Sequence, residues 1–374
     1  MRPTPRFFLT AILLGCSSSL FSQTEVPPAV HTSSLDSLPP YVPTQQVSGI
    51  IRNNGSAFAG LLKAWEIGFK KYQPGITFQD SLLSGDAAIG ALESGASDLA
   101  PNGREPVLTE FLSFSEVFNN DGPFQVTVAT GSYKELGRTW APVIFVNKDN
   151  PIAHLTLKQL DQIFGAERTG GYSGYKWVST HARPANENIR TWGQLGLTGE
   201  WADKTIQTYG YAPTGMSNFF ELTVFHGGTK WNPNLRQYVE TSAKQATSHA
   251  GTTDQMMDDL SRDKYGIAWA GLAHAQGRAG VKALALAVSP NGPFIPCNEQ
   301  TVRDRTYPLT RSIFFQLNHL PGTPIEPRLK EFLLYILSRE GQNAVAAQGE
   351  YLPLTAAELK LQREALEISP SSIR

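Results

Sequence analysis

Three short runs of small polar residues, far apart in the chain, each precede an apolar stretch with helical spacing. They cover residues 53–58, 84–89 and 213–220. A turn that opens a helix presents backbone N–H groups without intrahelical partners, together with the positive end of the helix dipole, and both attract anions. Three such turns predict one anion-binding site assembled from several loops.

The second turn leads into the most informative stretch of the sequence. A short apolar helix is expected over residues 87–93, followed by a buried strand over 97–100 and another polar turn that ends at Arg104. A turn at the carboxyl end of a buried strand is where sheets covered by helices hold their ligands. We therefore expect this stretch to contribute to the anion site.

The elements that must position these turns alternate along the chain. Strand-like and helix-like segments follow one another from residue 47 to residue 354, which predicts an α/β fold with covered sheets. The 374 residues, 41% of them hydrophobic, are enough for two domains. The formal net charge of −1 argues against a nucleic-acid partner, although neutral N–H and O–H donors can still hold a small anion.

The N-terminus has the pattern of an export signal. Arg2 and Arg6 precede an apolar run over 7–14 that is too short to span a bilayer. The run ends at Leu14-Gly15-Cys16, which resembles a bacterial lipobox, so Cys16 is a candidate for lipidation. Cleavage near residue 22 by ordinary signal peptidase is the rival interpretation. Residues 23–46 are rich in Pro, Ser and Thr, and we expect a flexible tether there.

The sequence offers little support for an enzyme. It contains no Gly-x-Ser-x-Gly, His-Glu-x-x-His, Walker A or Cys-x-x-Cys motif, and its seven histidines are scattered. Loss of Cys16 to lipidation or cleavage leaves Cys297 alone, and a lone cysteine is most often a small buried hydrophobe. We therefore expect no catalytic residue, cofactor or metal ion.

The order of motifs from residue 47 to residue 354 resembles the substrate-binding proteins of bacterial phosphate ABC transporters, a branch of the type 2 periplasmic binding proteins. The motifs are Gly55-Ser56 with Trp65, Ser84-Gly85-Asp86-Ala87-Ala88-Ile89, Ser97-Asp98-Leu99-Ala100 with Arg104, residues 143–151 and 155–165, Thr214-Gly215-Met216-Ser217 with Phe219, Tyr265-Gly266-Ile267-Ala268, Tyr307-Pro308-Leu309, and residues 349–354.

This resemblance implies two α/β lobes joined by two crossover strands, with the ligand in the cleft between them. The crossovers are expected near 143–147 and 306–309, which gives a discontinuous first lobe (47–145 plus 307–374) and a second lobe over 146–306. Such proteins act as monomers that capture phosphate outside the cytoplasm and deliver it to an ABC permease. The same fold also allows two alternatives, an envelope-anchored sensor or scaffold without transport, and a receptor for another tetrahedral oxyanion.

The resemblance also implies the residues that bind the ligand. It assigns hydroxyl and N–H donors to Ser56 and Ala57, to Ser84 and Gly85, and to Thr214, Gly215, Met216 and Ser217. Ordinary capping of the helices that follow is the alternative role for each of these turns.

Two departures from the family pattern concern charged groups. The family commonly places an arginine shortly before the third turn, where this chain has Tyr209-Gly210-Tyr211, and an aspartate in the turn where this chain has Gly103. Arg104 is the candidate replacement for the charge, with a surface ion pair to Glu105 as the alternative. Asp86 is the candidate proton acceptor, with stabilisation of the helix dipole as the alternative.

Overall fold

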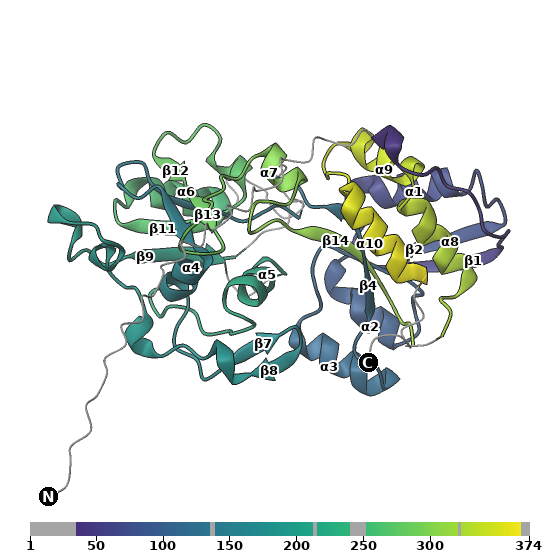
Figure 1. Ribbon diagram of the computed structural model, residues 1–374, viewed down its shortest axis with the longest axis horizontal. Coiled ribbons are helices and arrows are strands. Elements are labelled where there is room, and N and C mark those ends of the chain that lie inside the picture. Colours follow the sequence, from purple (N-terminus) through teal and green to yellow (C-terminus); the bar gives the residue numbers. More distant parts are fainter. Residues whose placement is uncertain (1–34, 135–138, 212–214, 240–251, 321–322, 368–374) are drawn as a thin grey trace, which may run out of the picture. The chain divides into compact units, whose positions relative to one another are not determined.

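The computed structural model describes residues 35–134, 139–211, 215–239, 252–320 and 323–367 (Figure 1). The expected α/β composition is present, and the strands form two groups, each with its own buried core. Among the described residues, no helix is long and apolar enough to cross a membrane.

The first group holds two small sheets at its centre. Its strands are β1 (Gly49–Asn54), β2 (Ile76–Ser81), β3 (Ala100–Asn102), β4 (Phe124–Thr130) and β14 (Ser312–Leu317). β1 and β2 pair in parallel, and β14 pairs antiparallel with β3 on one side and β4 on the other. A single parallel bridge from Asn53 to Leu99 connects the two sheets, so the carboxyl ends of β1 and β3 lie close together.

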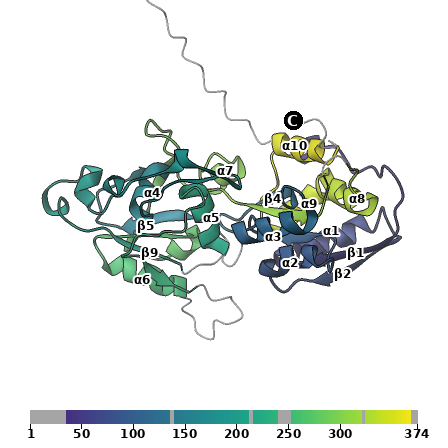
Figure 2. The same cartoon turned by 90° about the horizontal axis from the view of Figure 1, so that it is seen from below.

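Six helices belong with these strands (Figures 1 and 2). They are α1 (Leu61–Phe69), α2 (Ala88–Glu93), α3 (Leu108–Phe118), α8 (Pro327–Ile336), α9 (Arg339–Gln348) and α10 (Ala356–Glu367). Sequence signals define where several of them begin: Ser338 caps α9, and Pro327 stands in the first turn of α8. The apolar faces of α1 and α8 meet β14 through Phe69, Phe332 and Phe315.

The second group is built on a five-stranded sheet in the order β10-β9-β11-β5-β12. Its strands are β5 (Val143–Asn147), β9 (Gln207–Tyr211), β10 (Arg236–Tyr238), β11 (Gly266–Ala270) and β12 (Val281–Ala283). Four shorter strands pair as β6 (His154–Thr156) with β13 (Ala285–Ala287) and β7 (Gly171–Ser173) with β8 (Lys176–Val178). The helices are α4 (Leu157–Phe164), α5 (Gly215–Val224), α6 (Thr252–Arg262) and α7 (Glu299–Arg303).

The chain passes between the two groups twice. It leaves the first core at Thr130 and enters the second by Trp140, and it returns between Leu309 and Ile313. Strand β5 pairs with β11 and β12, so all of it lies in the second sheet, whereas the predicted division falls in its middle, after residue 145. The two crossing segments are tied together because the hydroxyl of buried Tyr307 donates to the carbonyl of Pro142 (2.8 Å).

Residues 35–46 lie in the segment that the sequence predicts as a flexible tether. Leu38 and Tyr41 are instead buried in the first core. Tyr41 donates its hydroxyl to Glu331 of α8 (2.6 Å), and the backbone N–H of Thr44 donates to the same carboxylate (3.1 Å). From Leu35 onward the chain is therefore a strap packed on α8 and α9, because its apolar side chains and its N–H groups find partners there.

Replacing Tyr41 with Phe should lower the free energy of unfolding by about 1–2 kcal/mol, because the change removes a hydrogen bond to a buried carboxylate. The measurement is urea unfolding followed by circular dichroism. Tyr72→Phe is the matched control: the ring of Tyr72 packs against Tyr41, and its hydroxyl has no hydrogen-bond partner among the described residues. Equal effects of the two variants would show that the bond to Glu331 does not stabilise the strap.

Candidate functional site

The carboxyl end of β3 brings the first two polar turns together. In the first turn, the backbone N–H of Ser56 donates to the carbonyl of Pro101 (2.8 Å). Gly55 has a φ of +148°, and a Cβ on it would lie 2.2 Å from the same carbonyl oxygen. Only glycine allows this close approach, so the sequence of the turn fixes its position against β3.

The residues after Ser56 adopt a strained backbone. Phe58 and Ala59 have φ values of +46° and +55°, in the left-handed region that L-residues avoid. The Phe58 ring is buried among Trp65, Phe315 and Tyr351, and this packing holds the conformation in place.

The strained turn leaves one donor available. The hydroxyl of Ser56 accepts the N–H of Phe58 (3.3 Å) within the turn, whereas the N–H of Ala57 has no partner among the described residues. Of the two residues expected here as ligands, Ala57 therefore offers its backbone N–H, and Ser56 offers its hydroxyl proton.

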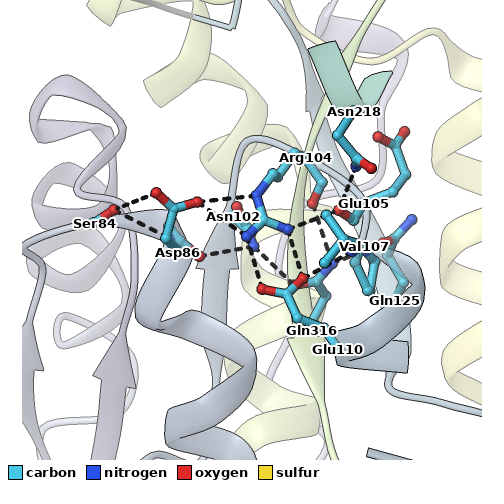
Figure 3. A network of polar contacts seen from close by, with 12 residues as sticks. Ser84, Asp86, Asn102, Arg104, Glu105, Val107, Glu110, Gln125, Asn218 and Gln316 are labelled. Carbon is cyan, nitrogen blue, oxygen red and sulfur yellow. Dashed lines mark hydrogen bonds and ion pairs between the residues drawn. The ribbon is translucent and has the colours of Figure 1, made fainter. Parts of the chain in front are cut away.

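The second turn is fixed by buried amide side chains (Figure 3). The Nδ2 of Asn102 donates to the carbonyl of Gly85 (3.2 Å) and to Oε1 of Gln316 (3.3 Å), and both amides are buried. A side chain at Gly85 would meet the Asn102 oxygen at 2.6 Å, so this residue must be glycine for the turn to approach β3. The Ser84 hydroxyl accepts the N–H of Asp86 (3.1 Å) and so caps the short turn of helix.

Arg104 lies at the centre of this network, held between two carboxylates (Figure 3). Its two terminal nitrogens donate to the two oxygens of Glu110, Nη1 to Oε2 at 2.7 Å and Nη2 to Oε1 at 2.8 Å. Its other edge faces Asp86, with Nη2 3.0 Å and Nε 3.3 Å from Oδ1. The pair to Glu105 considered from the sequence is replaced by a bond from Nη1 to the carbonyl of that residue (3.1 Å).

The two carboxylates differ in their freedom. Glu110 also accepts the N–H of Val107 (2.9 Å), the residue at the start of α3, so its position is fixed. The Asp86 side chain is 79% exposed, whereas that of Arg104 is 8% exposed. Burial alone would lower the pKa of Arg104, but its bonds to Glu110 and Asp86 raise that pKa above its usual value. Arg104 therefore stays charged. Of its two carboxylate partners, the exposed Asp86 is the one that can move away at a small cost in free energy.

The third turn meets Arg104 at the first residues of α5. A Cβ on Gly215 would lie 3.0 Å from Cδ of Arg104, so the stem of Arg104 packs against the start of this helix. Asn218 donates to the carbonyl of Glu105 (3.4 Å). Met216 is buried with its thioether sulfur against Arg311, and Ser217 is buried as well. Thr214 and Cys16 lie outside the described residues.

Two charged residues of this region were not foreseen from the sequence. Arg311, which is 4% exposed, donates from Nη2 to the carbonyl of Gly103 (2.9 Å) and from Nη1 to the sulfur of Met216. Its signal in the sequence is a cation at the end of the Tyr307-Pro308-Leu309-Thr310 run that marks the second crossing. Glu110 could have been found from its place at the third position of a helix that begins with Leu108.

The region where the family commonly has an arginine, Tyr209-Gly210-Tyr211, has no room for a side chain at its middle residue. A Cβ on Gly210 would lie 2.6 Å from Nε1 of Trp269, which is buried in the second core. A long side chain therefore cannot leave β9 at this residue without displacing Trp269. In the part of the chain that the structure describes, no group of three or more His, Cys, Asp or Glu residues could hold a metal ion.

The two groups of strands, with polar turns meeting at β3 and α5, define a two-lobed α/β binding protein of the periplasmic-receptor type. The chain is 30% identical over 321 residues to the phosphate-binding protein PstS of two strains of Pseudomonas aeruginosa, which covers 85% of this chain and 87% of each relative. The chain therefore belongs to the PstS family of phosphate-binding proteins, and the family predicted from the motif order is confirmed. No family model matches the sequence.

A solved structure supports the fold independently. The crystal structure of PstS from Borrelia burgdorferi superposes with a TM-score of 0.51, and the match covers 83% of this chain and all of that one. At 14% sequence identity this likeness shows the fold alone. The predicted two-lobed α/β fold is confirmed.

Replacing Ala59 with Gly should raise the free energy of unfolding by about 0.5–1 kcal/mol, because glycine adopts a φ of +55° without the strain of a Cβ. Ala64→Gly is the matched control, since exposed Ala64 lies in the regular helix α1, where glycine costs about 1 kcal/mol. Thermal and urea unfolding of both variants measure the difference. Destabilisation by Ala59→Gly would contradict the strain described for the first turn.

Replacing Glu110 with Gln should lower the free energy of unfolding by about 1–3 kcal/mol, because buried Arg104 then loses the charge that its terminal nitrogens face. The control is Glu116→Gln on the same helix, an exposed residue for which we expect a change within about 0.5 kcal/mol. The measurement is urea unfolding at neutral pH. A Glu110 variant as stable as the Glu116 control would show that Arg104 does not depend on this carboxylate.

Proposed function

We propose that this protein is the substrate-binding component of an ABC transporter for inorganic phosphate. The observation that carries the proposal is the 30% identity over 85% of the chain to proteins named for phosphate binding. It is supported by the convergence of the expected anion-binding turns on β3 and α5. The name of these relatives describes binding and no catalysis, and the proposed cycle needs neither a cofactor nor a chemical change of the ligand.

In this proposal the phosphate is held mainly by uncharged donors. These are the hydroxyl of Ser56 and the N–H of Ala57, the second turn at Ser84 and Gly85, and the third turn, for which the family motif assigns Thr214, Gly215, Met216 and Ser217. Neutral N–H and O–H groups at helix starts bind anions well where water is excluded. The contribution of α5 is limited to its backbone and to hydroxyls that can turn toward the ligand, because Met216 has no hydroxyl.

Arg104 would take the phosphate at the edge that faces Asp86. Its other edge is held by both oxygens of Glu110, so the pair of Nε and Nη2 is the remaining place for an oxyanion. Because the Asp86 side chain is largely exposed, it can move aside and remain near the ligand. The phosphate would then bridge the arginine and the aspartate.

Asp86 would select for a protonated ligand. Phosphate near neutral pH keeps a proton that it can donate to a carboxylate, whereas sulfate has none. A carboxylate beside the bound anion therefore accepts a hydrogen bond from phosphate and repels sulfate. This role replaces the aspartate that the family commonly places where this chain has Gly103.

We also propose how the protein is placed in the cell. The N-terminal segment acts as the export signal. Processing at the lipobox leaves a lipidated Cys16 as the first residue, and cleavage near residue 22, which removes residues 1–22, is the rival route. The mature monomer then presents phosphate to a permease in the membrane. Mass spectrometry of the purified envelope protein distinguishes a diacylated N-terminal Cys16 from a chain cleaved near residue 22.

The first measurement is isothermal titration calorimetry of phosphate and sulfate with protein freed of bound anion by unfolding and refolding. We expect saturable binding of phosphate at a ratio of one to one, with sulfate much weaker, and a melting temperature that rises with phosphate. Absence of binding by phosphate would overturn the proposed function.

Replacing Asp86 with Asn should lower the preference for phosphate over sulfate at least tenfold, because the amide no longer repels an anion without a proton. Phosphate binding itself should survive, since the amide oxygen still accepts a hydrogen bond. Asp203→Asn, an exposed change in the second group, is the control and should leave both affinities unchanged. An unaltered ratio of dissociation constants in the Asp86 variant would remove this residue from the recognition of phosphate.

A further inference from the structure

The charges around Arg104 do not favour an anion. One guanidinium faces the carboxylates of Asp86 and Glu110, so the three groups together carry a charge of −1. The region before α5 where the family commonly has an arginine holds no cation in this chain, and its Gly210 packs against Trp269. Positive charge from another residue close to the same turns would therefore strengthen the binding of a phosphate at the Asp86 edge.

Arg311 lies between two parts of the proposed site. Its Nη2 donates to the carbonyl of Gly103 (2.9 Å), the residue directly before Arg104. Its Nη1 contacts the sulfur of Met216, in the first turn of α5. The guanidinium carbon stands 5.1 Å from the centre of the Phe219 ring, one turn further along the same helix. The cation therefore reaches the loop after β3 and the start of α5 at once.

We propose that Arg311 is the second cation of the phosphate site and donates directly to a phosphate oxygen. The proposal rests on the proposed function. A thioether is a weak acceptor, so Nη1 can exchange the sulfur of Met216 for a charged oxygen at little cost. The carbonyl of Gly103 and the face of Phe219 keep the guanidinium in place during this exchange. With Arg311 included, the charge of the four side chains rises from −1 to zero.

The backbone around Arg311 suits this role. The N–H of Gly131 donates to the carbonyl of Arg311 (2.9 Å), and β14 begins at the next residue, Ser312. The side chain therefore starts from a fixed point where the chain returns to the first group. An arginine placed there can donate to acceptors of both groups without any displacement of its own backbone.

The alternative is that Arg311 has a purely structural role and only links Gly103 to Met216. Substitutions distinguish this role from direct binding of phosphate. The experiment is calorimetric titration of phosphate into the wild type, Arg311→Met, Arg311→Lys and a control, Arg190→Met. Arg190 also donates to carbonyl oxygens, those of Gln162 and Gly165 at the end of α4. Urea unfolding without phosphate measures the structural effect of each change.

We expect phosphate to bind about 100-fold more weakly to Arg311→Met. Binding to Arg311→Lys should be about 10-fold weaker, because lysine keeps the charge but cannot form a bidentate pair of hydrogen bonds. Arg190→Met should lose stability at an unchanged dissociation constant. If the wild type binds phosphate and the dissociation constant of Arg311→Met lies within threefold of the wild-type value, the role proposed for Arg311 is overturned, while the proposed function stands. If Arg311→Met does not fold, the same limit applied to Arg311→Lys decides. A wild type that binds no phosphate would overturn both proposals.

Discussion

The hydrogen bonds at the carboxyl end of β3 are the interaction on which the candidate site depends. The carbonyl of Pro101 accepts a hydrogen bond from the first turn, and the amide of Asn102 donates one to the second. The carbonyl of Gly103 accepts a hydrogen bond from Arg311. β3 is only three residues long, so it keeps its place through β14, whose Gln316 bonds to Asn102 and to the carbonyl of Arg104. Two segments more than two hundred residues apart in the chain thus define one set of loop positions.

The ion pairs of Arg104 orient its guanidinium more than they stabilise the fold. A buried arginine between two carboxylates gains hydrogen bonds but loses hydration, and such clusters often contribute little net stability. What they provide is a fixed orientation, because Glu110 holds one edge of the guanidinium and caps α3 with the same oxygen. An anion that arrives at the other edge meets a group whose side chain is already ordered. The exposed Asp86 is the only member of the cluster with room to adapt.

Local patterns in the sequence predicted most of the fold. The helix expected over residues 87–93 is present as α2, because its buried face determines it, whereas the strand expected over 97–100 lies at residues 100–102 as β3. The prediction of a tether over residues 35–46 was wrong because their Pro and Ser content is typical of flexible segments. The burial of Leu38 and Tyr41 depends on helices near the other end of the chain, which local composition does not reveal. α7 and α10 were missed because short or strongly charged segments carry little periodicity. Arg311 could not be placed from the sequence, since its contacts lie about one hundred and two hundred residues away.

The bond from Tyr307 to Pro142 limits how the molecule can deform. Two independent connections between bodies would allow twisting and sliding as well as bending. Here the two crossing segments are fastened to each other on the side of the second core, where Tyr307 is buried. The N–H of Gly131 donates to the carbonyl of Arg311 and ties the same two segments together again on the side of the first group. Two segments that are tied to each other at both ends bend as one connection, which favours bending between the groups over twisting and sliding.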